Sequence, residues 1–156
     1  MKNDQIQNKL FIELHVPDFK KIKKFYSQLG FNIILEEPIK KRLGYLVMQR
    51  QGTKINFYGG DRRVYKQSFF KHFPKETKRG YEVEITIPIN NIEKYYRKVL
   101  PSIKKSLTQK LELKRWGKKD FRLVDPFGFY LRFTEPMDWS LCFCRSGKVF
   151  KKCHGK

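Results

Sequence analysis

The stretch HVPDFKKIKKFYSQL (residues 15–29) is the clearest indicator of the fold, because its pattern occurs again in TIPINNIEKYYRKVL (residues 86–100). In each copy an apolar residue followed by proline ends a strand, and an amphipathic helix comes next. Asp18 is the expected N-cap of the first helix, and Gly30 the expected residue just beyond its end. Two matches in the same order predict an internal repeat. The apolar helix positions recur at i, i+3, i+4 and i+7: Ile22, Phe25, Tyr26 and Leu29, then Ile92, Tyr95, Tyr96 and Val99.

Three short strands are expected after each helix, separated by charged or glycine-bearing turns. They are residues 31–37, 42–51 and 54–60 in the first half and residues 109–116, 118–125 and 129–135 in the second. Each half therefore has the order β-α-β-β-β, which predicts an α+β fold in which two tandem modules form a concave, barrel-like mixed sheet. The modules are expected at residues 9–58 and 80–136. The linker over 59–79 is basic and aromatic, with a short helix expected over 64–73.

The composition points to contact with polyanions. The chain has 156 residues, a formal net charge of +20 and a sequence pI near 10.0. Such an excess of positive charge favours association with RNA, ribosomes, DNA or an anionic membrane surface; a basic surface without a specific partner is the alternative. The N-terminus has no apolar run of signal-peptide length, no stretch is long enough to span a bilayer, and three cysteines cannot all pair within the chain. These features predict a cytoplasmic protein.

Two segments resemble the vicinal oxygen chelate (VOC) superfamily, which includes glyoxalase I, the extradiol dioxygenases and the bleomycin and fosfomycin resistance proteins. They are VPDFKKIKKFYSQLGF (residues 16–31) and VDPFGFYLRFTEP (residues 124–136). The resemblance implies that the concave side of the sheet is a ligand cavity. It also implies that metal-dependent members hold an ion there, with one ligand from the first and one from the last strand of each half. Paired chains are common for this fold, so a homodimer is a further expectation.

Strand alternation indicates which side chains face this cavity. They are Glu13, His15, Asn56, Tyr58, Glu82, Glu84, Tyr130 and Arg132. The resemblance places Phe11, Asn56, Glu82 and Arg132 at the four metal positions. Phenylalanine has no donor atom and arginine repels a cation, so no catalytic metal is expected in the cavity. Two alternatives stay open: a shift of two residues offers a metal His15 with Glu84 or Glu13, or the glutamates Glu13, Glu82 and Glu84 form internal ion pairs with Arg132.

Residues 137–156 are expected to be a tail separate from the domain over residues 1–136, and this tail holds every cysteine, in CFCRSGKVFKKCH (residues 142–154). Cys142, Cys144, Cys153 and His154 suit a closed tetrahedral site for structural Zn²⁺. The segment is too short to fold by burial alone, so bound metal would supply its stability. The spacing resembles the SEC-C motif, a zinc knuckle found in bacterial proteins. The resemblance implies a docking module whose cations suit an acidic partner: Arg145, Lys148, Lys151 and Lys152.

These observations favour a non-catalytic protein, either one that binds an anionic or neutral small molecule in a metal-free cavity or an adaptor, with the zinc tail as its docking part. One alternative is a metal-dependent lyase or isomerase of the glyoxalase type, or a dioxygenase, with a displaced metal site. Another is a factor that binds RNA or the ribosome through its basic surface. The sequence has no Gly-rich phosphate loop and no nucleophile elbow, and His72 in the linker is expected to be solvated.

Overall fold

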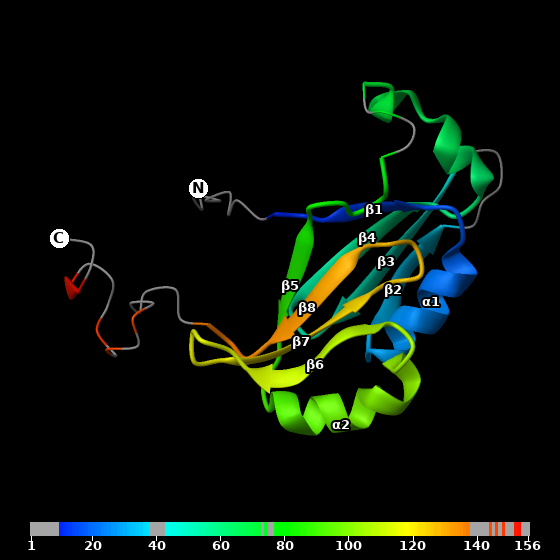
Figure 1. The fold of residues 1–156 in the computed structure, drawn as a ribbon. Helices are drawn as coiled ribbons and strands as arrows, with labels where there is room; N and C mark the ends of the chain where they lie inside the picture. The colour runs from blue at the N-terminus through cyan, green and yellow to red at the C-terminus, as the bar shows by residue number, and fades with distance from the viewer. Residues whose placement is uncertain are drawn as a thin grey trace, which may run out of the picture. The chain divides into compact units, whose positions relative to one another are not determined.

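The structure, a computed structural model, describes residues 10–37, 43–72, 74, 77–137, 144, 146, 148, 152 and 153. The chain divides into two compact units, residues 1–73 and 74–156, which we call the first and the second unit. Each contains one copy of the β-α-β-β-β order, so the expected duplication and the α+β class are confirmed (Figure 1). Within the described residues, no helix is long and apolar enough to cross a membrane.

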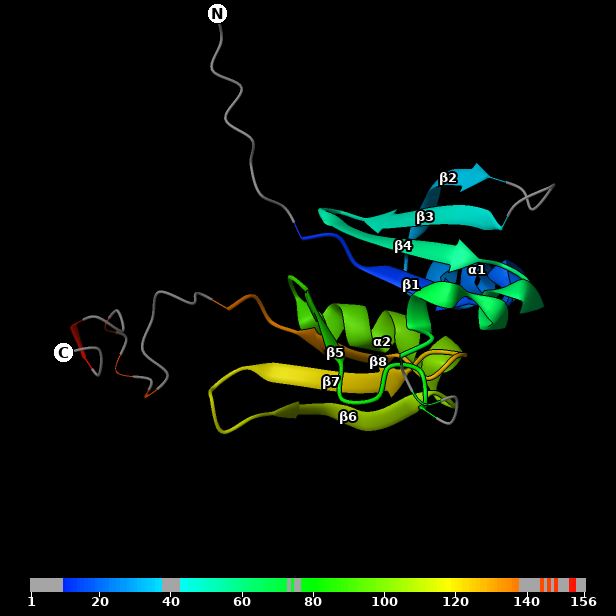
Figure 2. The same cartoon turned by 90° about the horizontal axis from the view of Figure 1, so that it is seen from above.

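The first unit is a four-stranded mixed sheet with one helix packed on one of its faces (Figures 1 and 2). Its elements are β1 (Glu13–Val16), α1 (Phe19–Gln28), β2 (Asn32–Glu37), β3 (Gly44–Arg50), β4 (Thr53–Gly59) and two 3-10 helices, η1 (Arg62–Lys66) and η2 (Ser68–Phe70). The strand order is β1-β4-β3-β2, with β1 parallel to β4 and the other pairs antiparallel. The parallel pair brings the first and last strands of the module side by side.

Local sequence explains where α1 begins and ends. The Asp18 side chain accepts a hydrogen bond from the backbone N–H of Lys21 at 3.1 Å, which satisfies a donor that the first helical turn leaves unpaired. Gly30 has φ +78° and follows the helix in the left-handed conformation that glycine adopts without strain. The predicted apolar face is buried against the sheet, where Tyr26 packs on Phe57 of β4 with ring centroids 5.0 Å apart.

The second unit repeats this arrangement. Its elements are β5 (Glu84–Pro88), α2 (Ile92–Ile103), β6 (Leu107–Leu113), β7 (Lys119–Val124) and β8 (Tyr130–Thr134), in the sheet order β5-β8-β7-β6. Its core stacks Phe121 on Phe133 with centroids 5.1 Å apart, and Tyr95 of α2 packs on both rings. The turn between β7 and β8 is held by Asp125, whose side chain accepts two backbone N–H groups at 2.8 and 2.9 Å. Both halves are thus built by the same local rules.

Three expectations from the sequence are wrong in detail. The strand expected to direct both Glu82 and Glu84 into the cavity begins only at Glu84, because Glu82 has φ +60°, a left-handed conformation that interrupts the extended backbone. The apolar residues on either side of Glu82, Tyr81 and Val83, are therefore 67% and 56% exposed. Phe11 precedes β1 and is exposed. The helix expected over 64–73 consists instead of η1 and η2, because the backbone is extended at the residue between them.

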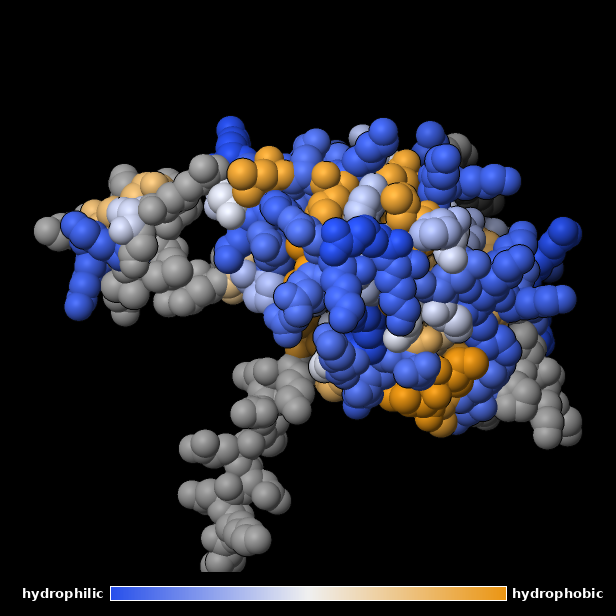
Figure 3. Space-filling view, turned by 90° about the horizontal axis from the view of Figure 1, so that it is seen from below, coloured by the Kyte–Doolittle hydropathy of each residue, from blue (hydrophilic) through white to orange (hydrophobic). Residues whose placement is uncertain are grey.

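The surface reflects the charge of the chain. Hydrophilic side chains cover most of the face drawn in Figure 3, with apolar side chains in separate small areas. Large apolar side chains are nevertheless exposed on the edge strand β2, where Ile33, Ile34 and Leu35 are all about half exposed. His72 is exposed, as expected.

Candidate functional site

The candidate site lies on the face of the first sheet opposite α1. Side chains alternate along β1, so its apolar residues are buried towards the helix while Glu13 and His15 project from the other face. The parallel register pairs Glu13 with Asn56 and His15 with Tyr58. The antiparallel register then sets Tyr45 of β3 opposite Tyr58. Three strands thus bring five polar and aromatic side chains to one face.

A pocket of about 410 Å³ opens on this face. It is lined by Glu13, His15, Tyr45, Tyr58, Phe69 and Phe70. The His15 ring lies 5.0 Å from the Tyr58 ring and 4.8 Å from the Phe70 ring, which it meets edge to face. Tyr45 and Tyr58 also meet edge to face, with centroids 6.4 Å apart. The volume is typical of a small-molecule pocket, and its walls are aromatic apart from one carboxylate.

Glu13 is the only carboxylate among the residues that line this pocket. Its Oε1 lies 3.0 Å from His15 Nε2, and its side chain is 39% exposed. Burial raises the pKa of the Tyr45 phenol, and a hydrogen bond to Glu13 raises it further. Tyr45 therefore stays a neutral donor. Because a carboxylate offers roughly four lone-pair sites, Glu13 can accept from His15, from Tyr45 and also from a ligand.

The two phenylalanines of the pocket lie in η2, and the preceding helix η1 is anchored at its start. Gly59 ends β4 with φ +110°, and Asp61 caps η1 by accepting the backbone N–H of Arg63 at 2.8 Å. The Arg63 guanidinium bonds the same carboxylate at 2.7 and 2.9 Å, which holds the pKa of Asp61 below its ordinary value. Val64 is buried at 3% exposure and ties η1 to the unit. Phe69 and Phe70, which we call the aromatic wall, follow this anchored helix, and Phe70 contacts the sheet through His15.

The corresponding face of the second unit carries a charge cluster. Asp120 is 0% exposed, and its carboxylate accepts a hydrogen bond from Arg132 Nε at 2.9 Å. Glu84 lies 3.4 Å from the guanidinium groups of both Arg122 and Arg132. The Arg132 guanidinium also lies over the Trp116 ring, 4.8 Å from its centroid. An ion pair between Glu84 and Arg132, one of the alternatives left open by the sequence, is therefore present.

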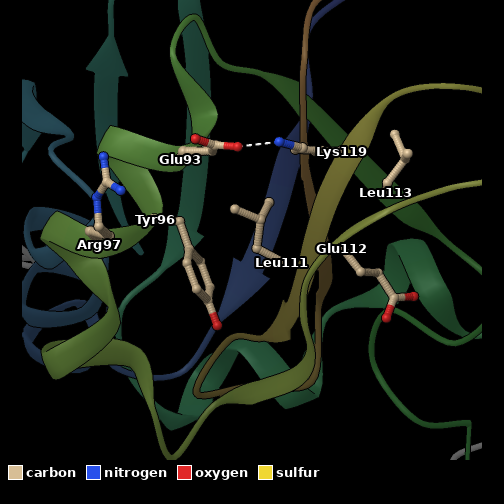
Figure 4. Close-up of a pocket in the computed structure, with 7 residues that line it drawn as sticks. All are labelled: Glu93, Tyr96, Arg97, Leu111, Glu112, Leu113 and Lys119. Carbon is tan, nitrogen blue, oxygen red and sulfur yellow. Dashed lines mark hydrogen bonds and ion pairs between the residues drawn. The ribbon is translucent and has the colours of Figure 1, made fainter.

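A second hollow, of about 360 Å³, lies between α2 and β6 (Figure 4). It is lined by Glu93, Tyr96, Arg97, Leu111, Glu112, Leu113 and Lys119. Glu93 and Lys119 form an ion pair across it, which raises the pKa of the lysine and lowers that of the glutamate. The two charged groups that face each other across the hollow therefore already neutralise one another.

The tail brings two of its expected zinc ligands together. Cys144 Sγ and Cys153 Sγ are 3.4 Å apart, far beyond the roughly 2.05 Å of a disulfide and near the roughly 3.8 Å between two sulfurs on one tetrahedral Zn²⁺. Ser146 Oγ lies 3.4 Å from Cys153 Sγ. Cys142 and His154 lie outside the described residues. Among the residues described, no group of three or more His, Cys, Asp or Glu side chains could hold a metal; the two thiols that are described fit half of a zinc site.

Known proteins match the tail and the fold separately. The model of the SEC-C motif matches residues 140–156. None of the curated proteins compared with the chain matches it. Solved structures match over most of its length, among them a bleomycin resistance determinant encoded on transposon Tn5 (TM-score 0.56, 22% identity, 85% of this chain and 100% of that one). A bleomycin-binding protein in complex with bleomycin matches similarly (TM-score 0.56, 20% identity, 84% and 100%).

A member of the glyoxalase/bleomycin resistance protein/dioxygenase superfamily from Sphaerobacter thermophilus also matches (TM-score 0.58, 17% identity, 83% of this chain and 98% of that one). The chain has the VOC fold. At such identities the likeness establishes the arrangement of elements and leaves the ligand open.

Within this VOC fold, the predicted cavity residues fall into two groups. Glu13, His15 and Tyr58 line the pocket of the first unit, and Asn56 lies beside Glu13 on the same face. In the second unit the residues sharing the face opposite α2 are Glu84, Tyr130 and Arg132. Glu82, expected among them, lies in the turn before β5. The alternation rule therefore holds wherever the strand exists.

Sequence reasoning missed several residues on the two sheet faces. Tyr45 alternates in phase with Val47 and Gln49 along β3, so the period-two pattern used for the other strands could have found it. Asp120 and Arg122 alternate in the same way along β7. Phe69 and Phe70 gave no such signal, because they come from an irregular segment whose path depends on the preceding turn.

Proposed function

We propose that the chain binds a small, neutral, planar molecule in the pocket of the first unit and releases it chemically unchanged. The observation that carries this proposal is the pocket of about 410 Å³ with aromatic rings on its walls and one carboxylate among them. Rings of this kind bind flat ligands by stacking and edge-to-face contact. Two proteins with the same fold bind or confer resistance to bleomycin, which shows that the fold supports binding of small molecules.

The charges favour a neutral ligand over an anion or a cation. The Glu13 carboxylate would repel an anionic group placed inside the pocket, because two like charges at short range in a partly dry site repel strongly. The net charge of +20 disfavours the approach of a cation. Of the two ligand classes expected from the sequence, anionic and neutral, the neutral one therefore fits the pocket itself.

Binding without chemistry is favoured by what occupies the expected metal positions. Arg132 donates a hydrogen bond to Asp120 and lies over Trp116, so its guanidinium already has partners within the second unit. Phe11 and Glu82 lie outside the strands that would have to present them. A glyoxalase-type enzyme remains the competing hypothesis, and it requires a metal other than that of the tail.

The first test removes one wall of the pocket. We expect Phe69→Ala to weaken binding of neutral bicyclic heteroaromatic compounds, measured by calorimetry on the full chain, by about tenfold, because stacking on one ring contributes roughly 1–3 kcal/mol. Phe69 is 69% exposed, so the variant should fold. Tyr81→Ala is the matched control, because Tyr81 is 67% exposed and does not line the pocket. Equal losses in the two variants would contradict this site. Conversion of the bound compound, checked by mass spectrometry, would contradict the non-catalytic role.

We further propose that Cys142, Cys144, Cys153 and His154 hold one structural Zn²⁺ and that the tail docks on an acidic partner. Support comes from the SEC-C match and from the two sulfurs 3.4 Å apart. Elemental analysis should find about one zinc per chain, and Cys144→Ser should lose it while keeping the Phe69-dependent ligand binding. A second equivalent of metal that survives Cys144→Ser would instead support the glyoxalase-type enzyme.

A further inference from the structure

The pocket holds a negative charge, whereas the segment that carries Phe69 and Phe70 holds positive charges. A ligand with a neutral part and an anionic part is compatible with both. Inside, Glu13 disfavours negative charge. Outside, the segment that carries Phe69 and Phe70 also carries the exposed cations Lys66 and Lys71. A ligand with a flat neutral part and a separate anionic part would place the first in the pocket and the second over the lysines. Nucleotides are built in this way, with a neutral base and an anionic phosphate.

The acceptor in the pocket selects among the bases. A carboxylate only accepts hydrogen bonds, so the base edge that meets Glu13 must present donors. Guanine presents two neighbouring donors, N1–H and the N2 amino group, which match the two oxygens of one carboxylate. The corresponding edges of adenine and cytosine place an acceptor nitrogen beside their amino group, and uracil flanks its single N–H with two carbonyl oxygens. These acceptors would face the carboxylate and repel it.

The aromatic walls suit any base, because every base has a π-face that stacks on aromatic rings. His15, Tyr58 and Phe70 already pack against one another around the pocket, at centroid distances of 5.0 and 4.8 Å from the His15 ring. Asp61 caps η1, the 3-10 helix that precedes the one carrying Phe70. Stacking on the rings would therefore provide affinity for any base, and hydrogen bonding to Glu13 would provide selectivity among the bases.

We propose that the pocket of the first unit holds the guanine base of a nucleotide or of an unpaired nucleic-acid strand, with Glu13 accepting N1–H and N2–H and with Lys66 and Lys71 facing the phosphate. This rests on the proposed function, since it names a ligand whose neutral, planar part would occupy the same pocket. It also accounts for the strong positive charge of a protein whose pocket itself holds a carboxylate.

Calorimetry on the zinc-loaded full chain with GMP, AMP, CMP and UMP tests the base. We expect GMP to bind about tenfold more tightly than the other three, as is typical when a bidentate hydrogen-bonded pair discriminates bases. IMP keeps N1–H and lacks the N2 amino group, so it should bind several-fold more weakly than GMP. This comparison needs no variant. Equal affinities for the nucleotides would overturn the proposal.

Variants then test the residues. Glu13→Gln should bring GMP and AMP to similar affinities, because an amide presents one donor and one acceptor where guanine needs two acceptors. Glu36→Gln, on β2 and outside the pocket, is the matched control and should keep the preference. The double variant Lys66→Gln, Lys71→Gln should weaken GMP and leave guanosine unchanged. A preference for GMP that survives Glu13→Gln would overturn the proposal.

Two further comparisons complete the test. One distinguishes a free nucleotide from a nucleic-acid strand, and the other distinguishes failure of the guanine assignment from failure of the proposed function. A short single strand with one guanine that binds more tightly than GMP, with an affinity that falls as salt rises, indicates a nucleic-acid ligand; GMP binding more tightly indicates a free nucleotide. Both support the proposal. If no nucleotide binds while the neutral heteroaromatic panel still binds through Phe69, the guanine assignment is overturned and the proposed function stands. If neither binds, both are overturned.

Discussion

Asp120 is a carboxylate with 0% exposure whose nearest charged neighbours are cations. Arg132 Nε donates to its Oδ2 at 2.9 Å, while Arg122 Nε and Lys114 Nζ lie 3.7 and 3.9 Å from its Oδ1. A buried charge costs several kcal/mol unless it is paired and hydrogen-bonded. The partners therefore explain how a charged residue is tolerated in the sheet. The same contacts hold the Arg132 guanidinium between Asp120, Glu84 and Trp116 within the second unit.

Loss of this single charge should be costly. We expect Asp120→Asn to lower the free energy of unfolding by about 3 kcal/mol, because the arginines beside it would remain partly buried without a counter-charge. Denaturant unfolding of the full chain measures the change. Glu36→Gln is the control, since its ion pair with Lys23 at 2.7 Å is about one-third exposed and should contribute less than about 1 kcal/mol. Similar losses in both variants would contradict the account of Asp120.

At the scale of elements, the turn after β4 connects the sheet to the two 3-10 helices, of which η2 carries the aromatic wall. Gly59 has φ +110°, and a Cβ added to it would lie 2.7 Å from the backbone oxygen of Val16 and 2.8 Å from a methyl group of Val64. Gly60 donates its N–H to the same Val16 oxygen at 2.8 Å. The end of β1 and the start of η1 are thus packed directly against this glycine, and only a residue without a side chain fits there.

Gly59→Ala should therefore destabilise the first unit and misplace its aromatic wall. We expect a loss of about 2–4 kcal/mol from the left-handed backbone and the clash with the backbone oxygen, together with weaker binding of the heteroaromatic panel. Gly52→Ala is the matched control, because nothing lies within 4 Å of an added Cβ and no positive φ is required. We expect that variant to change stability by less than about 1 kcal/mol. Binding that survives Gly59→Ala undiminished would mean that η2 is positioned by other contacts.

At the scale of the whole molecule, the charge of +20 acts on stability as well as on partners. Like charges on a compact chain repel one another, and unfolding moves them apart. The ion pairs that the structure describes engage only some of the basic residues, such as Arg63, Lys23 and Lys119. Repulsion among the remaining cations should therefore oppose folding at low ionic strength.

Salt should relieve this repulsion. We expect the melting temperature of the full chain, measured by calorimetry, to rise between low salt and about 0.15 M NaCl, where the screening length falls to about 8 Å. Relief of about 1 kcal/mol corresponds to roughly 2–4 °C for a chain of this size. Zinc-loaded protein should be used throughout, so that metal loss does not contribute. A melting temperature that falls with added salt would show that attractive ion pairs outweigh the repulsion.

Much of the fold could be read from local patterns. The apolar periodicity, the Asp18 cap and Gly30 correctly predicted where α1 begins and ends, because these signals act within a few residues of one another. Strand alternation placed Glu13 and His15 on the correct face for the same reason. Alternation failed at Glu82. The apolar residues around it alternate as in a strand, but the backbone of Glu82 is left-handed and belongs to a turn.

The chain order alone was enough to establish two β-α-β-β-β modules and a cysteine-rich tail, since periodicity, caps and ligand spacing are properties of neighbouring residues. Folding in three dimensions was needed to place Tyr45 opposite Tyr58 and to bring Phe70 beside His15. It was also needed to pair Asp120 with Arg132. These contacts join residues that are far apart along the chain, and their geometry depends on sheet register and on the turn at Gly59, which no local pattern encodes.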